Sequence, residues 1–359
     1  MDNRHVALAV LAIAFAAGGG EAAWARRAPA KTEAAAKADP LALGKAAYDR
    51  KDYAEALRWY GPAADQGSAA AQNALGALYR DGQGVTRDDA EAARLFKLAA
   101  DQGYAAAQYN LGGMLLEARG VAQNSAEALR LFKLAADQGN ALAQYNLGAL
   151  YNTGQLLPQD HVAAAHWLEL AAAQGLAPAQ YNLGTMYHEG LGVPKDYAQA
   201  AHWLKLAAAQ GHVNAQYNLG VMYYDGEGME TQNYVEAAHW LRLAAAQGHP
   251  GAQSNLGVMY DDGHGVARNY VEAVRWYRMA ADHGYPPAEN NLGSMYREGH
   301  GAPKDLIQAY KWFDLAAKGG LPVAAKNRDA VAETMTPTQV AEAQTQARQW
   351  TPASAQGSP

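Results

Sequence analysis

The amino-acid sequence predicts an all-α protein: a right-handed solenoid (superhelix) of about eight antiparallel helical hairpins with a C-terminal helical cap. Three observations predict this fold. A motif of about 36 residues recurs along the chain, apolar residues recur within it at helical spacing, and glycine-rich turns separate the expected helices. A repeat of this length is typical of solenoids, in which each unit buries its apolar faces against its neighbours.

The repeats align on a Leu-Gly pair, which is Leu183-Gly184 in the unit 176–211. Six full units have 36 residues, one has 37, and a shorter unit precedes them. The predicted repeat domain covers 41–320, with units at 41–67, 68–103, 104–139, 140–175, 176–211, 212–248, 249–284 and 285–320.

Each unit is expected to hold two helices. In the unit 176–211 the first helix is predicted over 177–189, where Ala179, Leu183, Met186 and Tyr187 form one apolar face. Gly184 lies beside that face, where it would allow a close helix contact. Gly190 and Gly192 end the helix. Ala118 and Leu156 replace glycine in two units, so those turns are expected to differ in shape.

The second helix begins after Asp196, an N-cap residue whose side chain accepts a free backbone N–H. The equivalent residues in the other units are Asp52, Asp88, Asn124, Asp160, Asn233, Asn269 and Asp305. Glutamate or glutamine follows three positions later in all units except at Ala163, which predicts capping boxes. Gly211 and its equivalents end the second helix.

The segments AQYNLGTMY, GLGV, DYAQAAHWLKL and AAAQG recur in register. In them the chain resembles the Sel1-like repeat, a bacterial exported relative of the tetratricopeptide repeat, over about 41–350. The resemblance implies a non-catalytic scaffold or adaptor for protein binding, with roles in envelope assembly, polysaccharide secretion, signalling or host contact. Cysteine-rich relatives have been linked to penicillin binding and β-lactamase activity, but this chain has no cysteine.

Residues outside the repeats suggest export. Arg4, the apolar run 6–17 and the small residues around Trp24 predict a signal peptide over 1–25, cleaved near Ala25, for a periplasmic or secreted protein. An uncleaved anchor in the inner membrane is the alternative. A flexible linker is expected over 26–40, capping helices over 321–350 and a disordered tail over 351–359. The second capping helix would start at Thr336 and carry Val340, Ala343, Ala347 and Trp350 on one stripe.

The composition argues against several other functions. With 18% charged residues, a net charge of −6 and no basic face, the chain does not suggest nucleic-acid binding. It lacks the sequence motifs of serine and metal hydrolases, and its Gly-x-Gly turns follow helices rather than strands, so no enzyme activity and no cofactor are expected. His166, His202 and His239 recur at one position, but their expected spacing is too wide for a shared zinc ion, so no metal is predicted.

Three further columns of residues recur between units. The tryptophan column is expected in the core, because leucine replaces tryptophan at Leu95 and Leu131. The column containing Asn146 and Asn182 is expected to form hydrogen bonds across repeat boundaries. Acidic residues end most first helices, where bonds from the glycine turn or pairing with nearby cations would stabilise them; these cations are Arg87, Lys195, Arg268 and Lys304. The alternative is an acidic groove rim that would favour a basic partner.

The candidate partner-binding residues form a tyrosine column on the first helices: Tyr109, Tyr145, Tyr181 and Tyr217. By helical spacing, Thr185 and His188 share the face of Tyr181, and Tyr224 is included with them. The resemblance places this face inside a concave groove, where tyrosine suits the binding of a protein or peptide. Packing between repeats is an equal alternative for the column. Other hypotheses are a peptidoglycan- or polysaccharide-associated protein or enzyme, and a structural spacer.

Overall fold

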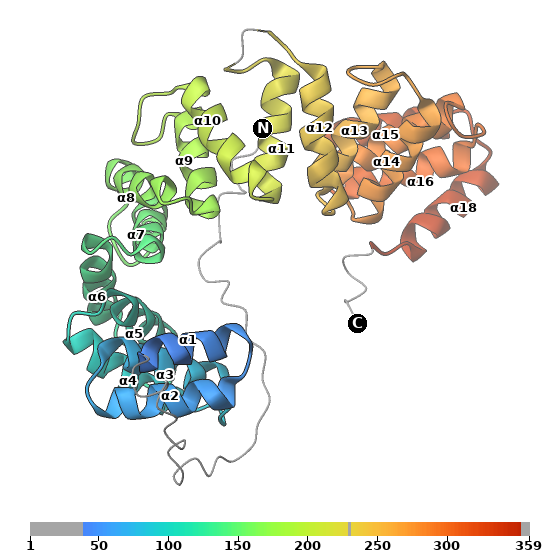
Figure 1. Cartoon of the computed structure of the whole chain (residues 1–359). Helices are drawn as coiled ribbons and strands as arrows, with labels where there is room; N and C mark the ends of the chain where they lie inside the picture. The colour runs from blue at the N-terminus through green and yellow to red at the C-terminus, as the bar shows by residue number, and fades with distance from the viewer. Residues whose placement is uncertain (1–38, 229–230, 353–359) are drawn as a thin grey trace. The chain divides into compact units, whose positions relative to one another are not determined.

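A computed structural model describes residues 39–228 and 231–352, and all regular secondary structure in these ranges is helical (Figure 1). The all-α repeat fold is therefore confirmed. The chain divides into two compact units, and the division falls within α9, with residues 180–190 in the second unit and the turn 191–193 in the first. The first unit contains α1 (Pro40–Asp49), α2 (Tyr53–Asp65), α3 (Ala69–Asp81), α4 (Asp89–Asp101), α5 (Ala105–Glu117), α6 (Ser125–Asp137), α7 (Ala141–Thr153) and α8 (His161–Ala173).

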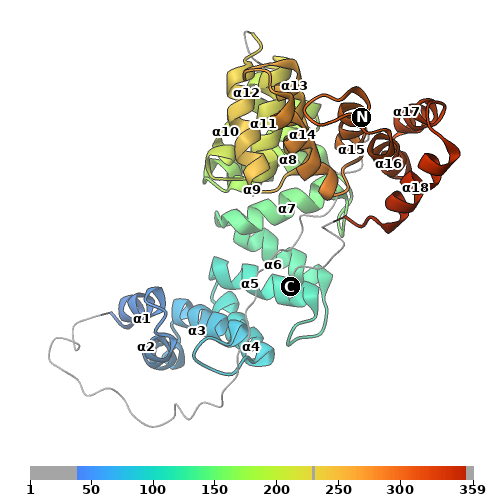
Figure 2. The same ribbon diagram turned by 90° about the vertical axis from the view of Figure 1, so that its right-hand side faces the viewer.

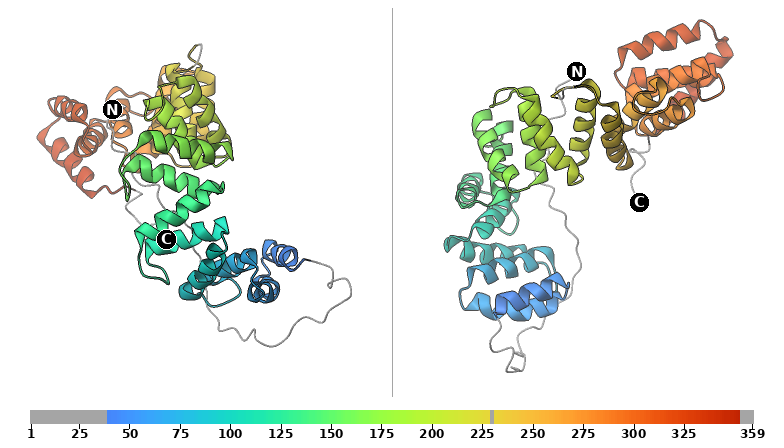
Figure 3. Two further views of the ribbon diagram at one scale, coloured as in Figure 1. Left: turned by 90° about the vertical axis from the view of Figure 1, so that its left-hand side faces the viewer. Right: turned by 45° about the horizontal axis from the view of Figure 1, so that its top comes forward.

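The second unit holds the remaining helices. They are α9 (Ala177–Glu189), α10 (Tyr197–Ala209), α11 (Val213–Asp225), α12 (Tyr234–Ala246), α13 (Pro250–Asp262), α14 (Tyr270–Asp282), α15 (Pro286–Glu298), α16 (Leu306–Lys318), α17 (Pro322–Ala332) and α18 (Pro337–Gln349). Within each unit, successive helices pack in antiparallel pairs, as the orange and red helices of Figure 3 show. We call the first helix of each pair the A helix and the second the B helix.

The N-caps of the B helices follow the prediction, but most of the capping boxes do not. Asp196 accepts the Ala198 and Gln199 backbone N–H groups at 2.9 and 3.0 Å, and the equivalent residues cap their helices in the same way. In three B helices the glutamate at the third position instead forms an ion pair with an arginine three residues further on. Glu91 binds Arg94 and Glu127 binds Arg130, both at 2.7 Å. The full box forms at Thr336 and Gln339 in α18.

The glycines of the Leu-Gly pairs allow the two helices of a hairpin to touch. A Cβ atom at Gly184 would lie 2.8 Å from Leu204 Cγ, and one at Gly76 would lie 2.9 Å from a ring carbon of Phe96. The second glycine of each turn lies against the B helix of the preceding repeat. A Cβ at Gly192 would lie 2.0 Å from the carbonyl oxygen of His161, so a larger residue there would push the turn off α8.

The prediction that two turns change shape is wrong. Ala118 (φ +55°) and Leu156 (φ +62°) keep the left-handed backbone that glycine adopts in the other repeats. The neighbouring repeats impose the same turn geometry, and these two residues therefore accept a conformation that disfavours a Cβ atom.

The core consists of small and aliphatic residues between the A and B helices. In the second unit, Leu219, Leu241, Leu256 and Met259 are each at most 2% exposed. The tryptophan column is buried less than expected. Trp312 is fully buried, whereas Trp167, Trp203 and the other members are half-buried at the edge of the core, next to the exposed histidine column.

The last two helices complete the described part of the second unit (Figure 2). α17 and α18 both pack on α16. The expected stripe of α18 faces inward: Ala343 and Ala347 are buried, and Trp350 contacts Trp312 with ring centroids 5.6 Å apart. The predicted signal peptide at 1–25 lies outside the described residues, as do most of the linker at 26–40 and most of the tail at 351–359.

Candidate functional site

The tyrosine column lies on one side of the A helices, which we call the A-helix face. This face carries the tyrosine column and, four and seven positions further along each A helix, residues such as Thr185 and His188 in α9. Tyr109 and Tyr145 belong to the first unit, and Tyr181 and Tyr217 belong to the second. All four tyrosines are half-buried, so each offers part of its side chain to solvent.

Each tyrosine of the column also takes part in packing between repeats. The hydroxyl groups of Tyr109, Tyr181 and Tyr217 are hydrogen-bonded to an asparagine of the next repeat, which is Asn146, Asn218 and Asn255, respectively. Burial raises the pKa of these three hydroxyl groups above the usual value. The column therefore takes part in packing between repeats, and part of each tyrosine side chain stays exposed.

The asparagine column crosses the repeat boundaries as predicted. Asn73 and Asn290 take the place of the tyrosine in two other repeats, and the same connection persists there. Asn110 donates to Asn73 at 2.9 Å, and Asn327 donates to Asn290 at 2.8 Å. The tyrosine and asparagine columns recur with the same regularity, so their spacing alone does not show that they bond to each other. Predicting this pairing would require matching residues of one repeat with residues of the next.

Histidine rings cover one face of two tyrosines. His212 stacks on Tyr181 with centroids 4.6 Å apart, and His249 stacks on Tyr217 at 4.3 Å. Both histidines are N-caps: their Nδ1 atoms accept the backbone N–H groups of Ala215 and Ala252 at 3.2 and 3.1 Å. Burial lowers the pKa of both imidazoles, which favours the neutral form that can accept these bonds.

Of the other predicted site residues, His188 and Tyr224 contact the next repeat, whereas Thr185 bonds within its own helix. Thr185 donates to the carbonyl oxygen of Asn182 at 2.7 Å. His188 Nε2 lies 2.8 Å from a carboxylate oxygen of Glu227, and the Tyr224 hydroxyl lies 3.2 Å from His264 Nδ1. His188 and Tyr224 stand at the same position of their A helices, where the repeats differ most: Arg80, Leu116, Asn152, His188, Tyr224, Asp261 and Arg297.

Part of the A-helix face is open. Gly113 stands four residues after Tyr109 in α5, and a Cβ atom built on it would meet no atom within 4 Å. The equivalent residues in the other repeats are Ala77, Ala149, Thr185, Val221, Val258 and Ser294. Small and medium side chains at this position leave room above the helix for a bound chain.

Two of the acidic residues at the ends of the A helices pair with an arginine that was not among the expected cations. Asp81 binds Arg80 at 2.7 Å, and Glu298 binds Arg297 at 2.7 Å, so the arginine directly before the acid takes the role. Arg87 instead binds Asp89 at 2.7 Å. A side chain on the same helix turn reaches the carboxylate more easily than one that lies beyond the glycine turn.

A second polar column was missed by the sequence analysis. A glutamine follows the first buried alanine of nearly every A helix, and it is buried; the residues are Gln72, Gln108, Gln144, Gln180, Gln216 and Gln253. Gln210 at the end of α10 donates to Gln180 at 2.8 Å, and Gln216 donates to the carbonyl oxygen of Ala208 at 3.1 Å. The signal was present in the recurrent Ala-Gln pair, but glutamine is expected on a helix surface.

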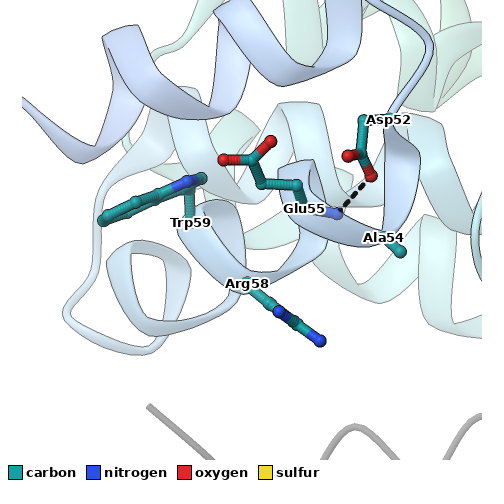
Figure 4. A pocket seen from close by; sticks show the side chains of 5 residues that line it. All are labelled: Asp52, Ala54, Glu55, Arg58 and Trp59. Carbon is teal, nitrogen blue, oxygen red and sulfur yellow. Dashed lines mark hydrogen bonds between the residues drawn. The ribbon is translucent and has the colours of Figure 1, made fainter. Parts of the chain in front are cut away.

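No metal site emerges from the described side chains. His166, His202 and His239 are exposed, as predicted. Across 39–228 and 231–352, no group of three or more metal-ligating side chains converges. A pocket at the start of α2 is lined by residues of that helix turn and its cap, where Asp52 accepts the Glu55 backbone N–H at 3.0 Å (Figure 4). Its polar groups serve the cap of α2.

These hairpins define a helical repeat protein, a class that offers an extended side-chain surface. The Sel1 repeat model matches residues 43–68, 69–104, 105–140, 141–176, 177–212, 213–249, 250–285 and 286–321, and the chain belongs to this family. Sel1 repeat proteins generally mediate protein–protein interactions, and their fold is typically a non-catalytic scaffold. Among curated proteins, none matches the sequence.

Two solved structures are similar over most of the chain. The protective antigen c5321 of uropathogenic Escherichia coli is 34% identical with a TM-score of 0.74, and the match covers 86% of this chain and 67% of that one. A Sel1 repeat protein from Oxalobacter formigenes is 34% identical with a TM-score of 0.57, and the match covers 80% of this chain and 84% of that one. Every helix in the described ranges is too short or too polar to cross a membrane.

Proposed function

We propose that this chain is a non-catalytic scaffold that holds a protein or an extended peptide on its A-helix face. The observation that carries the proposal is the tyrosine column: its side chains are fixed at the hydroxyl end by the next repeat, yet they stay half-exposed. Fixed tyrosines offer contact area without losing rotamer freedom on binding. The open space above Gly113 gives a partner chain room to approach Tyr109.

The stacked histidines favour a peptide over a glycan. A sugar ring binds most strongly to an open aromatic face, and His212 and His249 already cover one face of Tyr181 and Tyr217. A peptide can use the exposed edge of the same rings and the polar groups beside them. We propose that the partner acts in envelope assembly, secretion or signalling, since the predicted signal peptide at 1–25 would deliver the chain to the periplasm or beyond.

Gly113 is a suitable position for a test, because an added Cβ atom there would meet no other residue. A Gly113→Trp variant would fill the open space beside Tyr109, and Gly113→Ala is the matched control, because neither Cβ atom meets another residue. Partners crosslinked in the native cell envelope would be quantified by mass spectrometry after equal thermal stability has been verified. We expect Gly113→Trp to lose partners that Gly113→Ala retains. Equal capture by both variants would contradict binding at this face and favour a structural spacer.

A further inference from the structure

A cavity of about 400 Å³ lies between α13 and α15 on the A-helix face of the second unit. Its lining includes the carboxylates of Asp261, Asp262 and Glu298, the buried ring of Tyr277 and the thioether of Met295. Asp262 and Glu298 are the last residues of α13 and α15, where the helix dipole adds negative potential. The cavity therefore combines an apolar floor with an acidic rim.

The positive charges near the cavity neutralise this rim incompletely. Glu298 is paired with Arg297 at 2.7 Å. Arg268 donates to the main-chain oxygen of Asp262 at 3.3 Å, so its guanidinium group binds the helix end. His264 Nδ1 lies 3.9 Å from the Asp262 carboxylate and His300 Nδ1 lies 3.4 Å from that of Glu298. In the described part of the chain, no arginine or lysine forms an ion pair with Asp261 or Asp262. Burial and the charge of Asp262 raise the pKa of Asp261.

The first unit shows what fills the same position in another repeat. Arg80 stands where Asp261 stands in the second unit, one residue before the acid that ends the A helix. Its guanidinium group binds Asp81 through two hydrogen bonds of 2.7 and 3.0 Å, donates to Asn110 at 3.2 Å, and lies 5.9 Å from the ring centroid of Phe96. The cavity that remains beside Arg80 has a volume of about 20 Å³.

The three groups that hold Arg80 have counterparts around the larger cavity. Repeat alignment relates Asp81 to Asp262, Asn110 to Asn291 and Phe96 to Tyr277, and all three counterparts line the cavity. The following repeat holds its own arginine in the same way: Arg297 binds Glu298 and lies 5.7 Å from the ring centroid of Phe313. The repeat that contains Asp261 keeps the groups that hold the arginine in these two repeats. At the arginine position itself, however, it carries a carboxylate.

We propose that this cavity binds the guanidinium group of an arginine side chain supplied by a peptide partner. The inference rests on the proposed function, because it assigns one contact of the chain that the A-helix face would hold. Asp262 accepts two hydrogen bonds from the planar guanidinium group, as Asp81 does from Arg80. Asn291 accepts a third, the Tyr277 ring packs against the cation, and Asp261 adds a second negative charge.

Met295 provides a local probe for this site. We would label the methionine methyl groups of the full chain with ¹³C and titrate Nα-acetyl-arginine amide, with Nα-acetyl-citrulline amide as the neutral isostere. Met114 is the internal control, because it occupies the position of Met295 in the cleft that Arg80 fills. We expect arginine to shift the Met295 signal and leave Met114 unchanged, and citrulline to bind at least about tenfold more weakly.

Two variants separate the site from general electrostatic attraction. Asp262→Asn should weaken arginine binding roughly tenfold, because charge-assisted hydrogen bonds are lost. Asp261→Arg should abolish it by installing the arginine that other repeats carry, and it should fold because those repeats accept it. Glu342→Gln removes an exposed carboxylate of α18 and should bind like the wild type.

An unshifted Met295 signal, equal shifts of Met295 and Met114, or full binding by Asp261→Arg would each overturn the proposal. None of these outcomes bears on capture at Gly113 in the first unit, so this failure is distinct from a failure of the proposed function. Loss of arginine binding in Glu342→Gln would also overturn it, since that result would reflect net charge alone.

Discussion

Replacing Glu289 with glutamine should stabilise the second unit at alkaline pH and do so much less at acidic pH. Glu289 takes the place of the buried glutamine column in α15 and is 3% exposed. The glutamines at this position donate to the preceding B helix, as Gln253 does to the carbonyl oxygen of Ala245 at 3.3 Å. A carboxylate has no donor for this bond, and Gly319 stands where other repeats carry the second glutamine.

The structure sets the sign and the size of the effect. Burial raises the pKa of Glu289 from 4.5 to about 7. The stability that the neutral carboxyl group permits is therefore fully present below pH 4.5 and is lost as the pH rises through 7. One pH unit corresponds to about 1.4 kcal/mol, so ionising the buried group costs about 3 kcal/mol in total. Glutamine does not ionise, and its amide can donate to the carbonyl oxygen of Ala281.

Urea unfolding at pH 5 and pH 8.5 measures this difference. We expect the stabilisation by Glu289→Gln to be larger at pH 8.5 by about 2–3 kcal/mol. Glu342→Gln, at an exposed site of α18, is the control and should show no pH-dependent gain. A gain of equal size at both pH values, or a loss at pH 8.5, would refute the assignment of Glu289 as a buried, unpaired carboxyl group.

Two further predictions rest on the structure, and a third rests on the sequence of the N-terminal segment. Leu156→Gly and Ala118→Gly should each stabilise the first unit by about 1 kcal/mol in urea unfolding, because both residues have φ above +50° and are exposed; destabilisation would show that the turns are not strained. Burial lowers the pKa of His212, so its contribution is present above pH 6.5 and is lost as the pH falls through the lowered pKa. His212→Asn keeps the N-cap, as Asn140 does in α7, so thermal denaturation should show a smaller loss between pH 7 and pH 5; an unchanged loss would contradict this role. N-terminal sequencing of the protein from the cell envelope should begin at Arg26, and an intact Met1 would contradict cleavage near Ala25.

The helices were predictable because local residues determine where they begin and end. The expected first helix at 177–189 coincides with α9, and Asp196 caps α10. Such signals depend only on hydrogen bonds within a few residues, so one repeat contains the whole argument. The failure at Ala118 and Leu156 shows the limit of this reasoning, since the turn geometry shared by the repeats overrides the preference of a single residue.

The candidate site was predictable as a face but not as a set of contacts. Helical spacing placed Tyr181, Thr185 and His188 together, and the structure has them on one side of α9. The bonds to Asn218 and Glu227 come from the next repeat, and spacing within one helix cannot assign them. The same holds for the cavity at Asp261, whose character depends on whether the repeat carries an arginine at this position.

Photo-crosslinking from the A-helix face tests the central claim most directly. A photoreactive phenylalanine analogue would replace His188 on this face or Val235 on the B helix α12, which is 66% exposed. The two probes sit in the same unit and differ in the face that they occupy. We expect a discrete crosslinked partner from position 188 and none from 235 in intact cells. Equal crosslinking from both positions, or crosslinks from 235 alone, would contradict the assignment of the A-helix face as the binding surface.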